Sequence, residues 1–145
     1  MSSRVRTPGG ATFNVPPVRG QLFVCEGCCC GDPEKGARPV PHDIFHAEWE
    51  RRRLRSKVHL TFTACLGPCA VANVAYLQID GRSLWLHSLD DDPKLVAMLF
   101  DLIEHVVRER TFPPLPAALE QRRLAHFSDA PRSGSARLLP VVASS

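Results

Sequence analysis

Residues 21–31 read Gln-Leu-Phe-Val-Cys-Glu-Gly-Cys-Cys-Cys-Gly. In this stretch an apolar run leads directly into a group of thiols. A second apolar run ends in the same way at residues 65–69, Cys-Leu-Gly-Pro-Cys. All six cysteines lie in these two stretches, which about one strand-and-helix unit separates. The sequence therefore predicts a metal or iron–sulfur site built from two loops at one end of a sheet.

Length and composition are those of one soluble globular domain. The chain has 145 residues, of which 44% are hydrophobic, and no apolar run is long enough to cross a membrane. Its net charge of +3 is too small to indicate binding to nucleic acid. The N-terminus shows no apolar signal segment, so we expect a cytoplasmic protein. In a reducing compartment, clustered cysteines favour metal binding or redox chemistry over disulfides.

The pattern of apolar residues predicts an α/β domain over residues 20–110. A nearly continuous apolar run predicts a buried strand at 21–25, and alternating residues predict a second strand at 57–64. Between them we expect a helix from residue 43 to about residue 55. Because a helix connects the two strands, they should be parallel, and both cysteine loops should leave the same edge of the sheet.

The second half of the domain is predicted to add a hairpin and a helix. Asp80-Gly81 separates two strand-like runs, residues 73–79 and 83–87, as a two-residue hairpin turn does. Apolar residues at helical spacing then predict a helix from Pro93 to about Arg108. The predicted order is strand, helix, strand, strand, strand, helix, with one mixed four-stranded sheet.

The flanking segments lack this periodicity. Residues 1–19 are predicted to be a disordered arm and residues 128–145 a disordered tail, because Pro, Gly or Ser recur there without a period. Three prolines, at 113, 114 and 116, end the last helix of the domain. Residues 111–127 are therefore expected to form a linker with one short helix.

The cysteine spacings separate several kinds of site. They exclude the plant-type and bacterial four-iron motifs, which would need a cysteine at Pro33 or Gly31. A thiol–disulfide oxidoreductase remains an alternative, with Cys25 and Cys28 as its dithiol. Histidine ligation is not expected, since isolated histidines on helix and strand surfaces are usually structural; the domain contains His42, His46, His59 and His87.

Two metal sites remain open on spacing alone. A structural zinc ion could take four thiolates from Cys25, Cys28, Cys65 and Cys69, because zinc sites use pairs separated by two to four residues. A 2Fe–2S centre bound by two loops would use Cys25 and Cys30 followed by Cys65 and Cys69.

Residues 20–110 resemble the thioredoxin-like 2Fe–2S ferredoxin family. The most specific element is the Cys-Leu-Gly-Pro-Cys of residues 65–69 after a strand, together with the earlier cysteine loop, the hairpin and the final helix. The resemblance implies a thioredoxin-like ferredoxin fold, a 2Fe–2S cluster, electron transfer and often a homodimer. It also implies the cluster ligands, which are Cys25, Cys30, Cys65 and Cys69.

Three consecutive cysteines distinguish the chain from most of that family, which usually has one cysteine in the second-ligand region. Cys28 and Cys29 are therefore substitutes for Cys30 as the second ligand. The triple-cysteine version resembles ferredoxins found with cobalamin-synthesis proteins, which implies a redox step in the synthesis of cobalamin or another cofactor. No nucleophile, base and orienting group occur together, so we expect a one-electron carrier for a redox partner protein rather than an enzyme.

Overall fold

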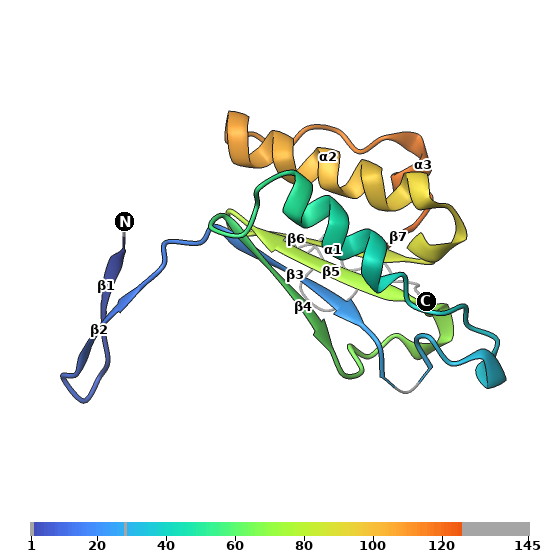
Figure 1. Ribbon diagram of the computed structural model, residues 1–145, viewed down its shortest axis with the longest axis horizontal. Helices are drawn as coiled ribbons and strands as arrows, with labels where there is room; N and C mark the ends of the chain where they lie inside the picture. The colour runs from blue at the N-terminus through green and yellow to red at the C-terminus, as the bar shows by residue number, and fades with distance from the viewer. Residues whose placement is uncertain (1, 28, 126–145) are drawn as a thin grey trace, which may run out of the picture.

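The computed structural model describes residues 2–27 and 29–125, which form two sheets (Figure 1). The main sheet has five strands, in the spatial order β4 (Val58–Thr63), β3 (Gly20–Cys25), β5 (Val74–Ile79), β6 (Arg82–His87) and β7 (Arg123–Leu124). β3 and β4 are parallel, and the other neighbours are antiparallel. The predicted four-stranded sheet is wrong, because β7 adds a fifth strand beside β6.

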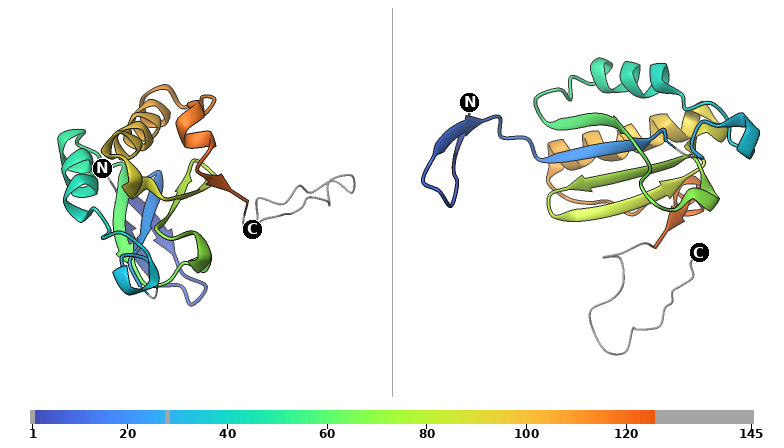
Figure 2. Two further views of the ribbon diagram at one scale, coloured as in Figure 1. Left: turned by 90° about the vertical axis from the view of Figure 1, so that its right-hand side faces the viewer. Right: turned by 90° about the horizontal axis from the view of Figure 1, so that it is seen from below.

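Two helices cover one face of the main sheet, as Figures 1 and 2 show from different sides. They are α1 (His42–Arg51) and α2 (Pro93–Glu109), and the short α3 (Ala117–Glu120) follows them in the chain. No helix among the described residues is both long enough and apolar enough to cross a membrane.

The core lies between the sheet and α2. Leu22 pairs with Leu77 and Leu77 with Leu84, so the register places these three buried side chains in a row on the helix-covered face. Asp92 caps α2 by accepting a hydrogen bond from the Lys94 N–H at 2.9 Å. Of the apolar positions that predicted α2, Met98 is half-buried and the others are buried. The buried residues of α2 are Leu95, Val96, Leu99, Phe100, Leu102, Ile103 and Val106.

α1 is shorter than the sequence predicted. The helix was expected to reach about Arg55, but it ends at Arg51, and Arg53 has a φ of 53°. A non-glycine residue in this left-handed region cannot continue a right-handed helix. On the buried side of α1, the Trp49 Nε1 donates a hydrogen bond to the Val58 carbonyl at 2.7 Å, which joins α1 to the start of β4.

A hairpin is present where the sequence predicted a disordered arm. β1 (Ser3–Arg6) pairs with β2 (Thr12–Val15) in an antiparallel register, and Figure 1 shows this hairpin apart from the main sheet. Gly10, at a φ of 92°, lies in the connecting turn, where glycine adopts the left-handed backbone without strain. Each strand has only four residues, which is too short for a period to be seen in the sequence.

The segment after α2 also has more structure than a linker. Within residues 111–127, one short helix was expected, and the structure places α3 there and β7 after it. Leu119 of α3 is fully buried. The predicted disordered tail, residues 128–145, lies outside the described residues.

Candidate metal centre

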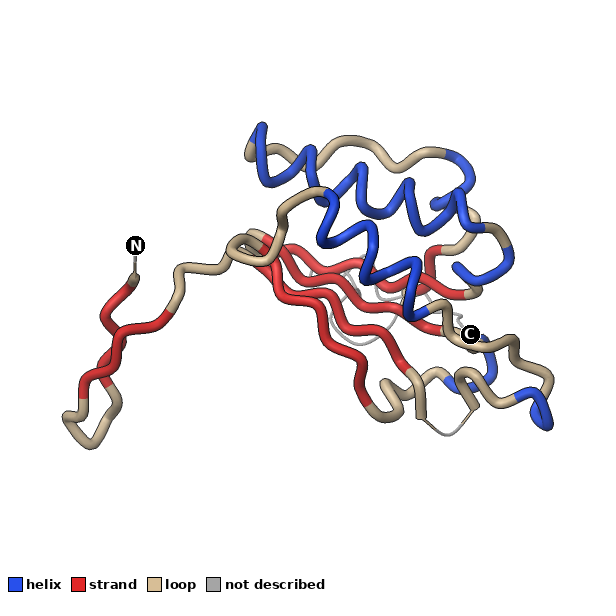
Figure 3. The backbone as a smooth tube through the Cα atoms, viewed as in Figure 1, coloured by secondary structure: helices blue, strands red, loops and turns tan. Residues whose placement is uncertain are grey.

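The two cysteine loops leave the same edge of the main sheet. β3 ends at Cys25 and β4 at Thr63, and these residues are partners in the parallel register. Just beyond them, the Glu26 N–H donates a hydrogen bond to the Thr63 carbonyl at 2.9 Å. Figure 3 shows both loops at this end of the sheet. The parallel strands β3 and β4 thus bring the two cysteine loops to one edge of the sheet, as the helix between the strands predicted.

Gly27 lets the two loops come into contact. A Cβ atom at this position would lie 3.0 Å from the Cys65 backbone nitrogen and 3.2 Å from the Ala64 Cα. Backbone atoms of the facing loop cannot move away as a flexible side chain could. A side chain at residue 27 would therefore force the loops apart, and with them the thiols that they carry.

The described residues bring three thiols together: those of Cys25, Cys30 and Cys65. Cys25 and Cys30 are 2% and 5% exposed, whereas Cys65 is exposed. Burial, then the hydrogen bond with the Cys25 thiol, raises the pKa of the Cys30 thiol to about 12; the charges of Cys25 and Cys65 contribute less. A hydrogen bond from the Val74 backbone acts in the opposite direction on that pKa. The thiols are close enough to influence one another.

This thiol set fits an iron–sulfur cluster chemically. Without metal, Cys30 holds its proton, because burial makes the charged thiolate costly in this place. As a ligand of ferric iron, the Cys30 sulfur would be held as thiolate and would give up its proton. None of the four cysteines whose side chains are described forms a disulfide.

Two of the six cysteines cannot be placed as ligands. Cys69 lies at the start of the turn η2 (Cys69–Val71), in the second loop as predicted, but its side chain is outside the described part of the structure. Cys28 is also outside it. Their roles, as fourth ligand and as substitute for Cys30, stay predictions.

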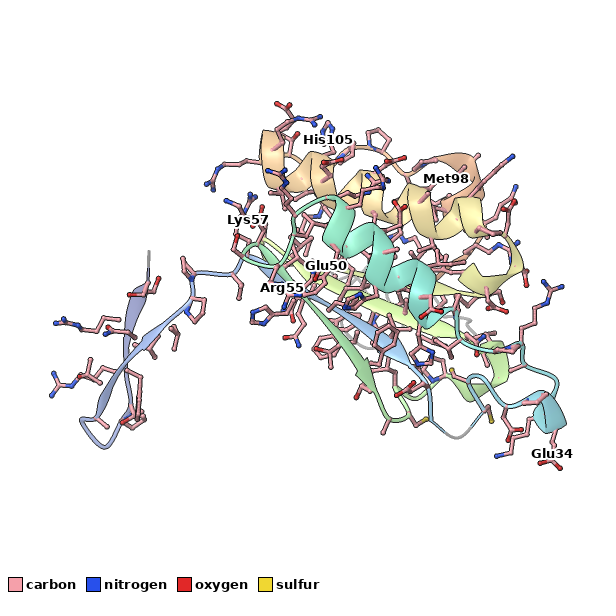
Figure 4. The ribbon with its side chains drawn as sticks, viewed as in Figure 1. Glu34, Glu50, Arg55, Lys57, Met98 and His105 are labelled. Carbon is pink, nitrogen blue, oxygen red and sulfur yellow. The ribbon has the colours of Figure 1, made fainter. Side chains whose placement is uncertain are left out.

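Cys29 belongs to the first cysteine loop but lies in a different environment from Cys30. Its half-buried side chain lines an open cavity of about 420 Å³ together with small residues and one lysine: Lys35, Gly36, Ala37, Ala70 and Ala72. The loop continues outward through the turn η1 (Pro33–Lys35), where Glu34 points away from the body of the protein in Figure 4. Cys29 thus faces a cavity, whereas Cys30 is buried near Cys25.

The donors do not form a compact site for one ion. Within residues 2–27 and 29–125, no group of three or more His, Cys, Asp or Glu side chains is arranged to hold a single metal ion. A 2Fe–2S cluster makes a different demand, because each of its two irons takes two protein thiolates and the donors are spread over a wider site. Cys25 and Cys30 are close enough together to be such a pair.

The histidines have other contacts. His42 at the start of α1 contacts the Glu26 carboxylate and lies against Phe62, with ring centroids 4.5 Å apart. On β6, the His87 Nδ1 lies 3.0 Å from the Ser88 hydroxyl, and burial lowers the pKa of the imidazole.

Asn73 is a site residue that the sequence did not reveal. Its side chain is 6% exposed and spans between the loop after Cys30 and the chain near Arg38. A lone asparagine carries no spacing or periodicity, so only its contacts in the folded chain reveal its position.

Among known proteins, similar ones were found only among solved structures. No family model matches the chain, and no curated protein does. A thioredoxin-like [2Fe–2S] ferredoxin from Aquifex aeolicus matches at 20% identity and a TM-score of 0.44, covering 74% of this chain and 92% of that chain. A second structure of the wild-type ferredoxin has the same identity and TM-score and covers 75% and 99%. Likeness at this level does not show that the chain shares their cofactor.

Proposed function

We propose that this chain is a 2Fe–2S ferredoxin that carries one electron. The observation that supports the proposal is the meeting of Cys25, Cys30 and Cys65 where the parallel strands β3 and β4 end. Four thiolates hold such a cluster, and Cys69 in the second loop is the proposed fourth. When bound, the cluster supplies the site that accepts and gives up the electron.

The chain's own residues hold the cluster and adjust its surroundings. Burial of Cys25 and Cys30 keeps water from one side of the site. The Val74 backbone N–H, which hydrogen-bonds to Cys30, would stabilise negative charge on that sulfur and so raise the reduction potential. Because a hydrogen bond to a ligand sulfur favours the more negative, reduced cluster, we assign Val74 a tuning role.

Cys65 gives the cluster an approach to solvent. Its side chain is exposed, in contrast to those of Cys25 and Cys30. A redox partner protein could therefore come close to the sulfur of Cys65, and short distance is what electron exchange between proteins requires. We propose a reducing, cytoplasmic setting and a cofactor-synthesis step, with cobalamin as the case implied by the triple cysteine. A homodimer also stays a prediction.

The burial of Cys25 disfavours the oxidoreductase alternative. An attacking thiol needs access to its substrate, but Cys25, the first thiol of the Cys25/Cys28 pair, is only 2% exposed. The remaining alternative is a zinc site on Cys25, Cys28, Cys65 and Cys69, which shares three of its four thiols with the proposed cluster. Metal and sulfide content separates zinc from the cluster directly.

Protein purified without oxygen tests the proposal. We expect about two irons and two acid-labile sulfides per chain. Cys25→Ser and Cys65→Ser should lose the cluster, and Cys69→Ser tests the fourth ligand. Cys29→Ser is the matched control, because Cys29 lines the neighbouring cavity. One zinc and no sulfide per chain would replace the proposal with the structural alternative.

A further inference from the structure

We propose that Asn73 positions Cys30 as the second cluster ligand and thereby decides which of the three consecutive cysteines binds iron. The inference rests on the proposed function, because it concerns ligand choice at the same site. Asn73 acts through the backbone next to Cys30 and does not itself bind iron. It is a positioning residue.

Both ends of the Asn73 amide are engaged. The Oδ1 accepts a hydrogen bond from the Gly31 N–H at 2.6 Å, and the Nδ2 donates one to the Arg38 carbonyl at 2.8 Å. Asn73 is also the one polar or charged residue in the buried set of the described chain. An amide at this depth is stable only while its donor and acceptor both have partners, so it holds the loop in one arrangement.

The bond to Gly31 fixes the peptide that follows Cys30. The Gly31 nitrogen and the Cys30 carbonyl belong to one planar peptide unit, so an acceptor on that N–H sets the orientation of the Cys30 backbone. Gly31 itself has a φ of 79°, and a Cβ atom there would lie 3.1 Å from the Val40 Cγ2. The backbone therefore makes its left-handed turn at Gly31, directly after Cys30, and this turn leads the chain away from the proposed cluster site.

The residue after Asn73 holds the sulfur of Cys30. The Val74 backbone donates a hydrogen bond to that thiol, while the Asn73 side chain holds the main chain one peptide further on. The Asn73 carbonyl in turn accepts a hydrogen bond from the Ser88 N–H at 2.8 Å, beyond the end of β6. Residues 73 and 74 thus form a support, anchored to the sheet, that holds both the backbone and the sulfur of Cys30.

Removing the amide should free the loop to offer other thiols. Without Asn73, the Gly31 N–H and the Arg38 carbonyl lose their partners, and the loop must shift to find replacements. Cys29 is adjacent and faces a cavity of about 420 Å³, so the loop has room to turn a different thiol toward the iron. Ligand exchange, rather than simple loss of metal, is the effect that distinguishes positioning from general stability.

The test places Asn73→Ala in two backgrounds of the full chain. With all six cysteines present, we expect iron content near that of the wild type but a changed, heterogeneous EPR spectrum, because neighbouring thiols replace Cys30. The double variant Cys28→Ser, Cys29→Ser should keep the wild-type spectrum. Adding Asn73→Ala to it should make iron loss to a chelator at least tenfold faster, because no neighbouring thiol remains.

Two further variants serve as controls. Gln78→Ala removes an exposed amide from β5 and should change neither the spectrum nor the rate of iron loss. Asn73→Asp keeps an acceptor for the Gly31 N–H but has no N–H for the Arg38 carbonyl, so its spectrum should change less than that of Asn73→Ala. If Asn73→Ala does not fold, Asn73→Asp carries the test, and a wild-type spectrum with a wild-type rate of iron loss in both backgrounds would contradict the proposal.

The outcomes distinguish this inference from the proposed function. A wild-type chain without iron and sulfide overturns both. A wild-type cluster that disappears in Cys28→Ser, Cys29→Ser, or that is unchanged by Asn73→Ala in both backgrounds, overturns the role of Asn73 and leaves the ferredoxin proposal standing.

Discussion

Cys30, the proposed second ligand, is a thiol that the fold keeps protonated while no metal is bound. Its thiol is buried beside that of Cys25, and its pKa is raised to about 12. A cysteine in the unfolded chain loses its proton near pH 8.5. Between these two values the unfolded metal-free chain binds fewer protons than the folded one, so folding becomes less favourable as the pH rises.

We expect the stability of the metal-free protein to fall with pH because of Cys30. Between pH 8.5 and 10, this thiol should lower the free energy of unfolding by up to about 1.4 kcal/mol per pH unit. Cys30→Ala should have a shallower slope, whatever its stability at pH 7. Denaturant unfolding at several pH values, in the presence of a chelator and a reductant, measures the difference. Equal slopes for the two proteins would show that Cys30 is not held as a thiol.

Residue spacing left the second ligand open. The interval from Cys25 favoured Cys30, with Cys28 and Cys29 as substitutes, and the structure buries Cys30 beside Cys25. The ligand set itself stays a prediction. Asn73 could not be found from residue spacing. Its partners are 42 and 35 residues away in the chain, so its role depends on tertiary structure.

At the scale of the elements, Arg52 joins the two helices that cover the sheet. Its side chain is 6% exposed and lies 2.8 Å from Glu48 on α1, 2.7 Å from Asp101 and 3.1 Å from Glu104 on α2. Arg51 also contacts Glu48, at 2.7 Å, but its side chain is 62% exposed. The basic run at the end of α1 therefore includes one arginine that links α1 and α2 and one that faces solvent.

Arg52→Ala should destabilise the protein by about 2–4 kcal/mol, because it leaves carboxylates without their buried partner and opens the contact between α1 and α2. Arg51→Ala is the matched control and should cost less than about 1 kcal/mol, as exposed ion pairs do. Urea unfolding of the two variants gives both values. Equal losses would mean that burial of Arg52 adds nothing to this network.

Long periodic elements were predictable and short ones were not. The seventeen residues of α2 repeat their apolar positions several times, and Asp80-Gly81 identifies the β5–β6 hairpin by its turn chemistry. β7 has two residues and no pattern, yet it pairs with β6. The end of α1 depends on the left-handed Arg53, which no propensity indicated.

At the scale of the whole molecule, Arg19 marks where the main body begins. Its guanidinium contacts the Asp80 carboxylate at the β5–β6 turn and donates a hydrogen bond to the Val106 carbonyl near the end of α2, at 3.0 Å. At the other end of the described chain, β7 pairs with β6 and Leu119 is fully buried. The packing favours a domain that continues to about residue 125, whereas the sequence predicted an end at residue 110.

Truncation decides between these two boundaries. A chain that ends at residue 127 should keep its cluster and lose less than about 1 kcal/mol of stability. A chain that ends at residue 110 also loses the buried Leu119 and the strand β7, so it should be destabilised by at least about 2–3 kcal/mol. Denaturant unfolding and iron content measure both effects. Equal stability of the two truncated chains would support the boundary at residue 110 that the sequence predicted.

The architecture was predictable where chain order determines it. A helix between two strands makes the strands parallel, and the parallel pair brings the cysteine loops to one edge. The fifth strand and the N-terminal hairpin depend on pairings between segments too short to be recognised, so the extent of the sheet was underestimated.

An EPR-monitored reductive titration of the 145-residue chain tests directly whether it carries a one-electron 2Fe–2S cluster. We expect the oxidised protein to show no EPR signal. On reduction it should take up about one electron per two irons and then show one unpaired spin per chain. Cys25→Ser, which removes a buried thiol of the first loop, should abolish that signal. A colourless, zinc-containing protein that takes up no electron would contradict the proposed 2Fe–2S cluster.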